Sequence, residues 1–553
     1  MHGRRHHHGI TTLARMGCDL IFGGRKTQGK IMEEQDKKTP QEIVYDPKKW
    51  EIDGETVNHY NGKQGDVIIP DGVKKIANEA FYNNGRLKSV TIPESVTNIG
   101  DRALDDCKNL ASVFYNGTLA QWCAVDKGNC SFMERASVIL IGENNMDTKT
   151  LTALKIPDGI TKIVAGTFVH LKKLETVEIP ASVTSISESA FFGCYNIANV
   201  FYNGTLAQWC AVDKSSDIMS TRHVILIGEN NMDTKTLTTF KIPDSVTKIG
   251  KYTFNLHEKL ETMEIPASVT SIDENMFSSC TSLESVTIPE SVTSIGNHAF
   301  SLCKNLKSVT IPESVTSIDN SVFLSCTSLK SVTIPASVTS IGENAFNRCT
   351  SLESVTILAS VTSISKGTFY NCTSLKTVEI PASVTSIGDS AFRNCKSLET
   401  VEIPASVTSI DDSAFSHCTS LESVTIPESV TSIGKDLFFE CTNLKSVTIP
   451  ESVTSIGDRA FGSCTSLKSV TIPASVTSIG SYEFDNCTSL ETVEIPANVT
   501  SIDFRAFNNC TSLKSVNYSG TKEQWGKIEI NDNGNENLKK CVIHCTDGDI
   551  TTE

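Results

Sequence analysis

The chain has 553 residues with 64 acidic and 49 basic side chains, which gives a formal net charge of −15 at pH 7. Such an acidic balance argues against a general binding surface for nucleic acid or for anionic membranes. No stretch of apolar residues is long enough to cross a bilayer, so no transmembrane helix is expected.

Residues 1–45 precede the regular part of the sequence and differ from it. The opening MHGRRHHHGITTLARMGC starts with basic residues, but its apolar stretch is short and Arg15 interrupts it, so it does not fit a signal peptide. The triplet His6, His7 and His8 can bind a transition metal loosely, yet we expect no metal role. We predict that residues 1–45 are disordered or follow from a misassigned start codon.

Residues 46–86 are predicted to form the entry to a repeat array together with its first copy. A leucine then recurs with a period of 23 residues, at Leu87 and Leu110, at Leu151 and Leu174, and at every twenty-third residue from Leu237 to Leu513. A fixed period of this length indicates a solenoid. One copy buries too little apolar surface to fold alone, so we expect stability to belong to the stacked array.

One copy, LKSVTIPASVTSIGENAFNRCTS, occupies residues 329–351, and we number its positions from the leucine. Alternating β-branched residues predict a short strand with one buried face. Pro335 at position 7 ends that strand because proline has no amide donor. The letters VTSI predict a second extended segment. A Gly, Asp or Ser at position 14 indicates a turn with unusual dihedral angles or a helix N-cap. The letters ENAFNRC then indicate one helical or 3₁₀ turn. The copies together predict a β-rich, right-handed, elongated array of 23-residue coils.

Two insertions interrupt the repeats within residues 87–236, whereas residues 237–512 are contiguous repeats and residues 513–553 are a predicted C-terminal cap and tail. The segment FYNGTLAQWCAVDK is identical at 114–127 and at 201–214, and YSGTKEQWGKI near the end is related to it. Trp122, Trp209 and Trp525 are predicted to cap the open ends of a hydrophobic stack. The alternative is a tryptophan platform that stacks on carbohydrate. Because the third example stands where the array stops, we favour capping.

The chain has 19 cysteines, and most of them follow the 23-residue period. Eleven occupy position 21 of consecutive copies: Cys280, Cys303, Cys326, Cys349, Cys372, Cys395, Cys418, Cys441, Cys464, Cys487 and Cys510. Stacked coils place neighbouring Cβ atoms about 4.8 Å apart, beyond the roughly 3.5–4.5 Å that a disulfide requires. We therefore predict a ladder of reduced, buried thiols that act as small apolar side chains.

A catalytic site would need a cluster of titratable groups outside the repeat pattern. The histidines of the array fall in separate coils, at His257, His298 and His417. HExxH and GxSxG motifs do not occur. Cys541, His544 and Cys545 lie close together but lack the second ligand pair of a zinc site. We expect no enzyme activity, no metal and no cofactor.

Positions 2, 3 and 5 of each strand point out of the inner sheet and give a polar face. At position 2, lysine and glutamate alternate from coil to coil, so most of these charges neutralise each other. Position 5 switches between threonine and glutamate. The predicted binding residues on this face are Glu379, Glu399, Glu402 and Glu422 with Lys376 and Lys445 beside them. A basic protein segment or a cation-bridged glycan would suit this patch, whereas the simplest alternative is a sheet face that only keeps the protein soluble.

The repeated phrase L-x-x-V-x-I-P-x-x-V-T-x-I-G-x-x-A-F-x-x-C resembles the BspA-like, treponemal-type class of leucine-rich repeat proteins, which are surface proteins of bacteria and protozoa. WEIDGETVNHYNGKQGDVIIPDGV at 50–73 resembles the entry of that class, and VNYSGTKEQWGKIEINDNGNENLKKCVIHCTDG at 516–548 resembles its exit. Departures are few: Leu358 replaces the proline of position 7, and Val164 replaces the glycine of position 14.

The resemblance implies a leucine-rich repeat solenoid without enzymatic activity. It also implies a cell-surface or secreted protein for adhesion or host interaction, which binds an extracellular protein or glycan, and we expect it to be a monomer. Two alternatives stay open. One is a structural or antigenic spacer without a specific ligand. The other is an intracellular scaffold for protein interactions, which the missing signal peptide favours.

Overall fold

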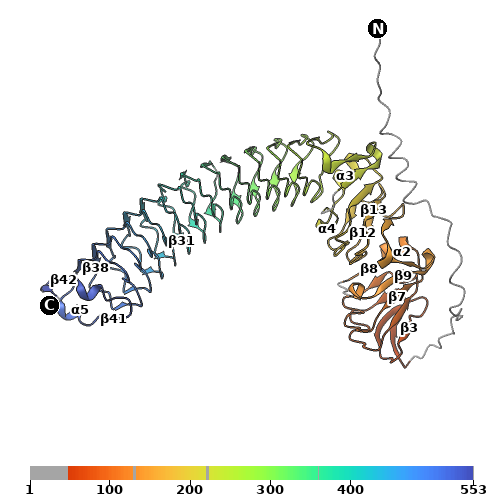
Figure 1. Cartoon of the computed structure of the whole chain (residues 1–553), viewed down its shortest axis with the longest axis horizontal. Coiled ribbons are helices and arrows are strands. Elements are labelled where there is room, and N and C mark those ends of the chain that lie inside the picture. The colour runs from red at the N-terminus through yellow and green to blue at the C-terminus, as the bar shows by residue number, and fades with distance from the viewer. Residues whose placement is uncertain (1–47, 129–131, 220–222, 359, 552–553) are drawn as a thin grey trace, which may run out of the picture. The chain divides into compact units, whose positions relative to one another are not determined.

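The computed structural model describes residues 48–128, 132–219, 223–358 and 360–551 (Figure 1). The predicted N-terminal segment 1–45, with its three histidines, lies outside the described residues. The chain forms two compact units that divide between Phe201 and Tyr202. Both units are built from stacked coils, and in the second unit the successive coils of the contiguous repeats follow one another in order along the stack.

Most coils carry one strand on the inner face and a second, usually shorter, strand on the opposite wall, as the repeat pattern predicted. In the coil at 329–351 these are β25 (Ser331–Ile334) and β26 (Ser340–Ile341). Exposed and buried residues alternate along β25. Its partner in the next coil is β27 (Ser354–Ile357), with Ser331 opposite Ser354, so the strands pair in parallel with a shift of one repeat.

The first unit begins with an antiparallel hairpin of β1 (Trp50–Asp53) and β2 (Thr56–Tyr60). Its inner-face strands are β3 (Asp66–Ile68), β5 (Ser89–Ile92), β7 (Ser112–Tyr115), β9 (Ser137–Leu140), β10 (Met146–Asp147), β11 (Ala153–Lys155), β13 (Thr176–Ile179) and β15 (Asn199–Tyr202). Its opposite wall holds β4 (Lys75–Ile76), β6 (Asn98–Ile99), β8 (Asp126–Lys127), β12 (Lys162–Ile163) and β14 (Ser185–Ile186). The helical segments are α2 (Leu119–Ala124), η1 (Phe132–Glu134), η2 (Ile141–Glu143) and η3 (Thr148–Thr150).

The second unit continues the same plan. Its other inner-face strands are β16 (His223–Leu226), β17 (Met232–Asp233), β18 (Thr239–Lys241), β19 (Thr262–Glu264), β21 (Ser285–Thr287), β23 (Ser308–Thr310), β29 (Thr377–Val378), β32 (Ser423–Thr425), β34 (Ser446–Thr448), β36 (Ser469–Thr471), β38 (Thr492–Ile495), β40 (Ser515–Tyr518), β42 (Val542–Cys545) and β43 (Gly548–Ile550). Its opposite wall also holds β20 (Ser271–Ile272), β22 (Ser294–Ile295), β24 (Ser317–Ile318), β28 (Ser363–Ile364), β30 (Ser386–Ile387), β31 (Ser409–Ile410), β33 (Ser432–Ile433), β35 (Ser455–Ile456), β37 (Ser478–Ile479), β39 (Ser501–Ile502) and β41 (Glu529–Ile530). The helical segments are α3 (Leu206–Ala211), α4 (Ser216–Met219), η4 (Ile227–Glu229), η5 (Thr234–Thr236), α5 (Lys522–Trp525) and η6 (Leu538–Lys540).

A third ladder of backbone hydrogen bonds runs through the turns of the coils. Positions 16 and 20 take left-handed backbone angles, for example φ of 57° at Asn344 and 61° at Arg348. The amide of Asn344 donates to the carbonyl of Lys366 at 2.9 Å, and that of Arg348 donates to the carbonyl of Tyr370 at 2.7 Å. The left-handed residues turn these amides toward the following coil, which satisfies donors that would otherwise be buried without a partner.

The sequence predicted a turn with unusual dihedral angles, or a helix N-cap, at position 14. The first of these is wrong for the glycines at this position, because the left-handed backbone angles lie at positions 16 and 20 instead. Gly342 takes no left-handed angle, but a Cβ atom there would lie 2.5 Å from the amide nitrogen of Asn320 in the preceding coil. Glycine at position 14 permits close contact between coils. The predicted helical turn after it is a series of short turns, such as Cys349 N–H to Phe346 O at 3.2 Å.

The core of the contiguous repeats in the second unit is a stack of phenylalanine rings, one from position 18 of each coil between residues 237 and 512. Neighbouring rings lie nearly parallel, with centroids 5.2–5.8 Å apart, from Phe254 to Phe507. The leucines of position 1 and the valines and isoleucines of the strands are buried around this stack. In the described part of the chain, no helix has the length and the apolar character needed to span a membrane.

Candidate binding surface

The inner strand face of the second unit carries ion pairs along position 2. Lysine and glutamate of neighbouring coils pair four times, with N–O distances of 2.8 Å for Lys307–Glu284, 3.7 Å for Lys376–Glu353, 2.9 Å for Lys445–Glu422 and 2.8 Å for Lys514–Glu491. The eight side chains are between 49% and 72% exposed. Ion pairs as exposed as these contribute only about 0–1 kcal/mol each. The predicted site residues Lys376, Lys445 and Glu422 are thus already paired with neighbours.

Glu379 and Glu402 differ from those residues because they occupy position 5 of consecutive coils. Their backbones form an isolated parallel bridge, which places the two carboxylates one above the other on the exposed face. In the described part of the chain neither side chain has an ion-pair partner. Like charges that lie directly opposite each other on a sheet repel, so this pair is a local excess of negative charge.

A groove of about 590 Å³ opens at these two carboxylates. Its lining is Ser354, Val355, Thr356, Thr377, Val378, Glu379, Ile380, Ala382, Thr400, Glu402 and Pro404. The strand ladder is short at this point, because β29 has only two residues and the next coil joins its neighbours through isolated bridges. The sequence pattern located the two acids, but the hydroxyl and apolar lining of the groove was not predicted.

Glu399 and Leu358 border this region without lining the groove. Glu399 is exposed at position 2, and its amide donates to the carbonyl of Lys376 at 3.2 Å. Leu358, which replaces the proline of position 7, donates its amide to the carbonyl of Ile334 at 3.0 Å and leaves its side chain 57% exposed. Of the four predicted acids, the groove therefore brings together Glu379 and Glu402 only.

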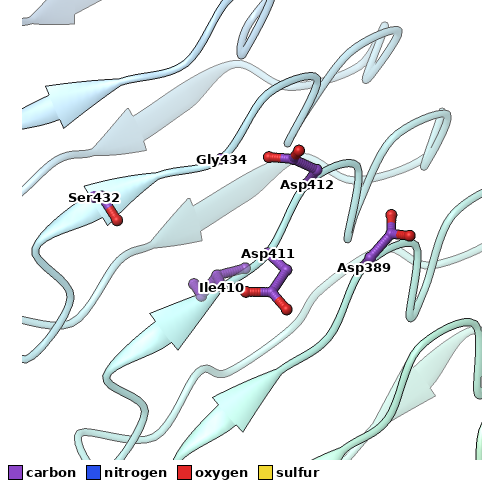
Figure 2. A pocket seen from close by; sticks show the side chains of 6 residues that line it. All are labelled: Asp389, Ile410, Asp411, Asp412, Ser432 and Gly434. Atoms are coloured by element: carbon purple, nitrogen blue, oxygen red, sulfur yellow. The ribbon is translucent and has the colours of Figure 1, made fainter.

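A second acidic pocket, of about 480 Å³, lies on the turn side of the coils and was not predicted from the sequence (Figure 2). It is lined by Asp389, Asp411 and Asp412, together with Ile410, Ser432 and Gly434. Two of the carboxylates have partners, since Asp389 pairs with Lys366 at 2.8 Å and Asp412 accepts the amide of Lys435 at 2.7 Å. Burial, with Asp412 and Asp389 nearby, raises the pKa of Asp411.

No group of three or more metal-binding side chains with suitable geometry occurs in the described residues. The C-terminal trio is separated by its contacts: Cys541 is buried and donates to the carbonyl of Asn537 at 3.1 Å, whereas His544 pairs with Asp549 at 2.9 Å. Cys545 is half-buried. Among the array histidines, His257 is buried and His417 pairs with Glu440 at 3.3 Å.

The cysteines of position 21 lie inside the array, and each thiol has a specific partner. From Cys280 to Cys510 each Sγ donates to the carbonyl of a phenylalanine one coil earlier, at 3.1–3.3 Å. Burial raises the pKa of these thiols, to about 12 at Cys349. The hydrogen bond gives a physical reason for a weak donor to recur at this buried position.

We expect thiol alkylation of the native protein to modify Cys545 before any cysteine of the ladder. A buried thiol with a raised pKa supplies almost no thiolate, and the thiolate is the reactive form. Alkylation at pH 8, mapped residue by residue with mass spectrometry, measures this order, and denaturation should make all the ladder cysteines reactive. Rapid native labelling of Cys349 would contradict a closed ladder, as would a bridge between Cys326 and Cys349.

The two inserted tryptophans are inside the protein, with Trp122 0% and Trp209 1% exposed. A buried indole offers no face to a ligand, so these residues cannot form a carbohydrate platform. Trp525 is half-buried and packs on Tyr518 with ring centroids 5.2 Å apart. The chain continues beyond Trp525 into the antiparallel pair of β42 and β43, which forms the last layer of the sheet.

The two insertions and the C-terminal end share one supersecondary module. In each, a threonine caps a short helix through a capping box, at Thr118, Thr205 and Thr521. The first helical amide is bound by a carboxylate further along the chain: Leu119 by Glu143 at 3.1 Å, Leu206 by Glu229 at 3.1 Å and Lys522 by Asp547 at 2.8 Å. Each module ends with an antiparallel strand. The chain therefore repeats its terminal module twice in its interior, which supports our proposal that all three are caps.

Sequence reasoning missed two lysines that complete the inserted modules. Lys127 and Lys214 are buried beneath Trp122 and Trp209, and their Nζ atoms lie 4.4 and 4.5 Å from the ring centres. Each donates to the carbonyl of its tryptophan, at 2.6 and 2.5 Å. In sequence they look like surface lysines. The available signal was threonine at position 17 of the next coil, where most coils have alanine and where these lysines find a hydroxyl partner.

Comparison with known proteins agrees with this geometry. The family model of the BspA type leucine rich repeat region matches the chain in six copies, over residues 57–124, 130–210, 225–353, 339–446 and 431–546. The chain belongs to this family of leucine-rich repeat solenoids, and the resemblance predicted from the repeat is confirmed. No curated protein matches the chain.

Several solved structures are similar to it. A leucine-rich repeat protein from Bacteroides ovatus is 32% identical over 53% of this chain and 89% of its own, with a TM-score of 0.42. A leucine rich cell surface protein from Faecalibacterium prausnitzii is 25% identical over 86% of this chain and 93% of its own, with a TM-score of 0.31. The pneumococcal vaccine antigen PcpA is 18% identical over 73% and 89%, with a TM-score of 0.37.

Proposed function

We propose that this chain is a non-enzymatic scaffold that binds a protein partner through the strand face of its second unit. In this proposal residues 237–512 carry the binding face, residues 46–86 and 513–553 form the caps, and residues 87–236 hold further coils. We also propose that it acts at the cell surface or after secretion, in adhesion or host interaction, as the name of the similar Faecalibacterium protein suggests for that relative.

The observation that carries the proposal is the groove at Glu379 and Glu402. Most acids at position 2 are neutralised by a lysine of the next coil, but these two stand unpaired, among the described residues, at the edge of a groove. The exposed lining carries hydroxyl groups, from Thr356, Thr377 and Thr400, beside the two carboxylates, whereas Val355, Val378 and Ile380 of the lining are buried core residues. Such a site suits a basic protein segment whose ammonium or guanidinium groups meet the carboxylates and whose polar groups meet the hydroxyls.

The affinity of this face should be modest and sensitive to salt. Exposed charge pairs contribute about 0–1 kcal/mol each and are screened over a Debye length of about 8 Å at physiological ionic strength. The face also lacks an aromatic anchor of the kind that dominates tight interfaces. Binding by several coils at once would compensate for weak single contacts.

We expect the triple change Glu379→Lys, Glu399→Lys and Glu402→Lys to abolish binding of a lysine-rich probe peptide and to leave the melting temperature nearly unchanged. These side chains are exposed, so their reversal alters the charge of the face and not its packing. Biolayer interferometry with an immobilised peptide of alternating lysine and serine, at two salt concentrations, measures the effect. The control is Glu290→Lys, Glu313→Lys and Glu428→Lys, the same charge change at exposed residues outside the groove.

Equal loss of binding in both triple variants would show that net charge alone attracts the peptide. Binding that persists in the groove variant would contradict the groove as the site.

If the protein binds neither basic peptides nor host cells, a spacer role is the better account. Proteolysis of intact cells separates the surface location from an intracellular scaffold, because only a surface protein would be cleaved. If binding requires a divalent cation and a glycan, the partner class is wrong although the groove is right.

A further inference from the structure

Three basic side chains are buried together at the beginning of the second unit. Lys214 is 2% exposed, Lys235 7% and His257 1%. They lie between the inserted helices α3 and α4 and the first coil of the contiguous array. Buried charges in proteins are normally paired with an opposite charge, so the partners of these three groups decide how the region behaves.

Lys214 joins helix α3 to the turn of the following coil. Its Nζ donates to the carbonyls of Trp209 at 2.5 Å and Val212 at 2.7 Å, and to the hydroxyl of Thr253 at 3.0 Å. All three acceptors are neutral oxygen atoms. The acid next to it in sequence, Asp213, is paired at 3.0 Å with Lys248. Cys210 is the other titratable group that faces this ammonium.

Lys235 and His257 form a second contact between the same elements. The Nζ of Lys235 donates to the carbonyls of Met219 at 3.1 Å and Asn255 at 2.5 Å. The ring of His257 lies 3.3 Å from that Asn255 carbonyl through Nδ1 and 3.4 Å from the hydroxyl of Thr234 through Nε2. Among the described residues, no carboxylate oxygen lies within hydrogen-bonding distance of either basic group.

The charged groups around this second contact are few. Asp233, Glu258 and Cys280 face Lys235, and Lys235 and Lys214 face His257. Asp233 is paired with His223 at 2.6 Å. The two lysines therefore repel the protonated form of His257, and the acids are too distant or too engaged to offset that repulsion.

The first insertion provides a natural comparison, because its segment 114–127 is identical to 201–214 but its surroundings differ. Leu171 stands there in the slot of His257, and the indole of Trp122 donates to the carbonyl of Thr167 at 3.4 Å. The corresponding indole of Trp209 is buried without a hydrogen-bond partner among the described residues. At these two places the second module therefore has a basic ring where the first has leucine, and it lacks the indole hydrogen bond that the first makes.

We propose that helices α3 and α4 and the coil at 234–257 form an acid-sensitive joint, which opens between the inserted module and the contiguous array when the pH falls. An open joint exposes all three basic groups to water, where they bind protons freely. The closed joint keeps them away from water and from counter-charges. Acid therefore favours the open form.

The pKa values agree with this direction. Burial lowers the pKa of Lys214 to about 7 and that of Lys235 to about 8, both from 10.5, and burial followed by the charge of Lys235 lowers the pKa of His257 well below 6.5. The open form thus binds more protons, so the stability of the closed joint rises with pH. The lysines make the stability of the closed joint depend on pH between pH 10.5 and 7, and His257 does so below pH 6.5.

The experiment is amide hydrogen exchange of the full chain at pH 7.5 and pH 5.5, with rates corrected for intrinsic exchange. Peptides from 206–219 and 234–257 should open between about tenfold and a hundredfold more readily at pH 5.5, since a displaced group contributes up to tenfold per pH unit. Coils at 283–352 and the first module at 118–128 should change far less. An equal acid effect in all these segments would overturn the proposal, because it would reflect general acid destabilisation.

A single substitution separates His257 from the lysines. His257→Cys installs the residue that most coils carry in this slot, and it should remove most of the change between pH 7.5 and 5.5. His257→Leu, which copies Leu171 of the first module, should behave in the same way and serves if the cysteine variant misfolds. Retention of the full acid response in both variants would overturn the role of His257. Lys235→Met should leave that response intact but reduce the change between pH 10 and 8.

Discussion

Replacement of Glu483 by alanine is expected to stabilise the C-terminal coils at pH 8, a large effect in an unusual direction. Glu483 is fully buried at position 17, where neighbouring coils carry Ala460 and Ala506. One carboxyl oxygen accepts the amide of Gly480 at 2.7 Å, and the other has no hydrogen-bond partner among the described residues. A buried polar atom without a partner costs free energy, and alanine removes it while fitting the slot.

The pH dependence of this effect follows from the pKa of Glu483. Burial raises that pKa from 4.5 to about 8, with Asp458 and Asp503 adding to the rise and the Gly480 amide opposing it. Between these values the folded state holds a proton that the unfolded state releases. Stability therefore falls as the pH rises from 4.5 to 8 and stays low above 8. At about 1.4 kcal/mol per pKa unit, the full penalty is on the order of 5 kcal/mol.

Thermal melting and amide exchange of the coils at 444–512, at pH 5 and pH 8, measure the prediction. The alanine variant should gain more at pH 8 than at pH 5. Glu483→Gln is the matched control, because it keeps the size of the side chain but removes the charge, and it should lose the pH dependence without gaining the full stability. An alanine variant less stable than the natural chain at pH 8 would show that Glu483 supports the fold.

Replacement of Asn535 by alanine is expected to fray the C-terminal coils. Asn535 is fully buried and ends the ladder of turn amides, because its Oδ1 accepts the amide of Phe507 at 2.9 Å. Its Nδ2 donates to the carbonyls of Asp503 at 2.8 Å and Asn531 at 2.7 Å. Alanine removes all three bonds and leaves the buried amide of Phe507 without a partner, at a cost of about 1–3 kcal/mol, whereas the exposed Asp503 and Asn531 can turn to water.

Amide exchange along the array measures this fraying, which should be strong after Leu490 and absent near Leu283, because each coil contacts only its neighbours. The matched control is Asn533→Ala: Asn533 is exposed and bonds the amide of Arg505 through its backbone carbonyl, which the substitution preserves. Trp525→Ala should give a smaller effect than Asn535→Ala, since Trp525 is only half-buried. Equal exchange in the two asparagine variants would refute the role of the Asn535 side chain.

The coil itself could be predicted from the sequence because its apolar positions repeat so often. Val332 and Ile334 alternate with polar residues, and Pro335 follows them, so the strand and its end are visible in any one copy. The ladder of Cys349 and its equivalents was predicted for the same reason. Because the same positions are apolar in most copies, substitutions in single copies do not hide the pattern, and the fold follows from that shared pattern.

The left-handed residues and the buried lysines could not be predicted in that way. Positions 16 and 20 carry side chains as different as Asn344, Arg348 and Leu302, and their backbone angles are imposed by bonds to the next coil. Lys214 has the sequence context of a surface residue, and only the packing of another coil buries it. The groove at Glu379 is lined by residues of three successive coils, so it is not visible in any one copy of the repeat.

The turn ladder gives every coil a direction, since the amides of positions 16, 18 and 20 face one neighbour and the carbonyls of positions 15, 17 and 19 face the other. Any coil presents the same donor side and the same acceptor side as the next. Genetic recombination between copies can therefore remove or add a whole coil and still join matching surfaces, provided that the exchange respects the 23-residue frame. Loss of a partial coil would break the match. The structure thus allows the array to change length by whole coils, provided that the capping modules are kept.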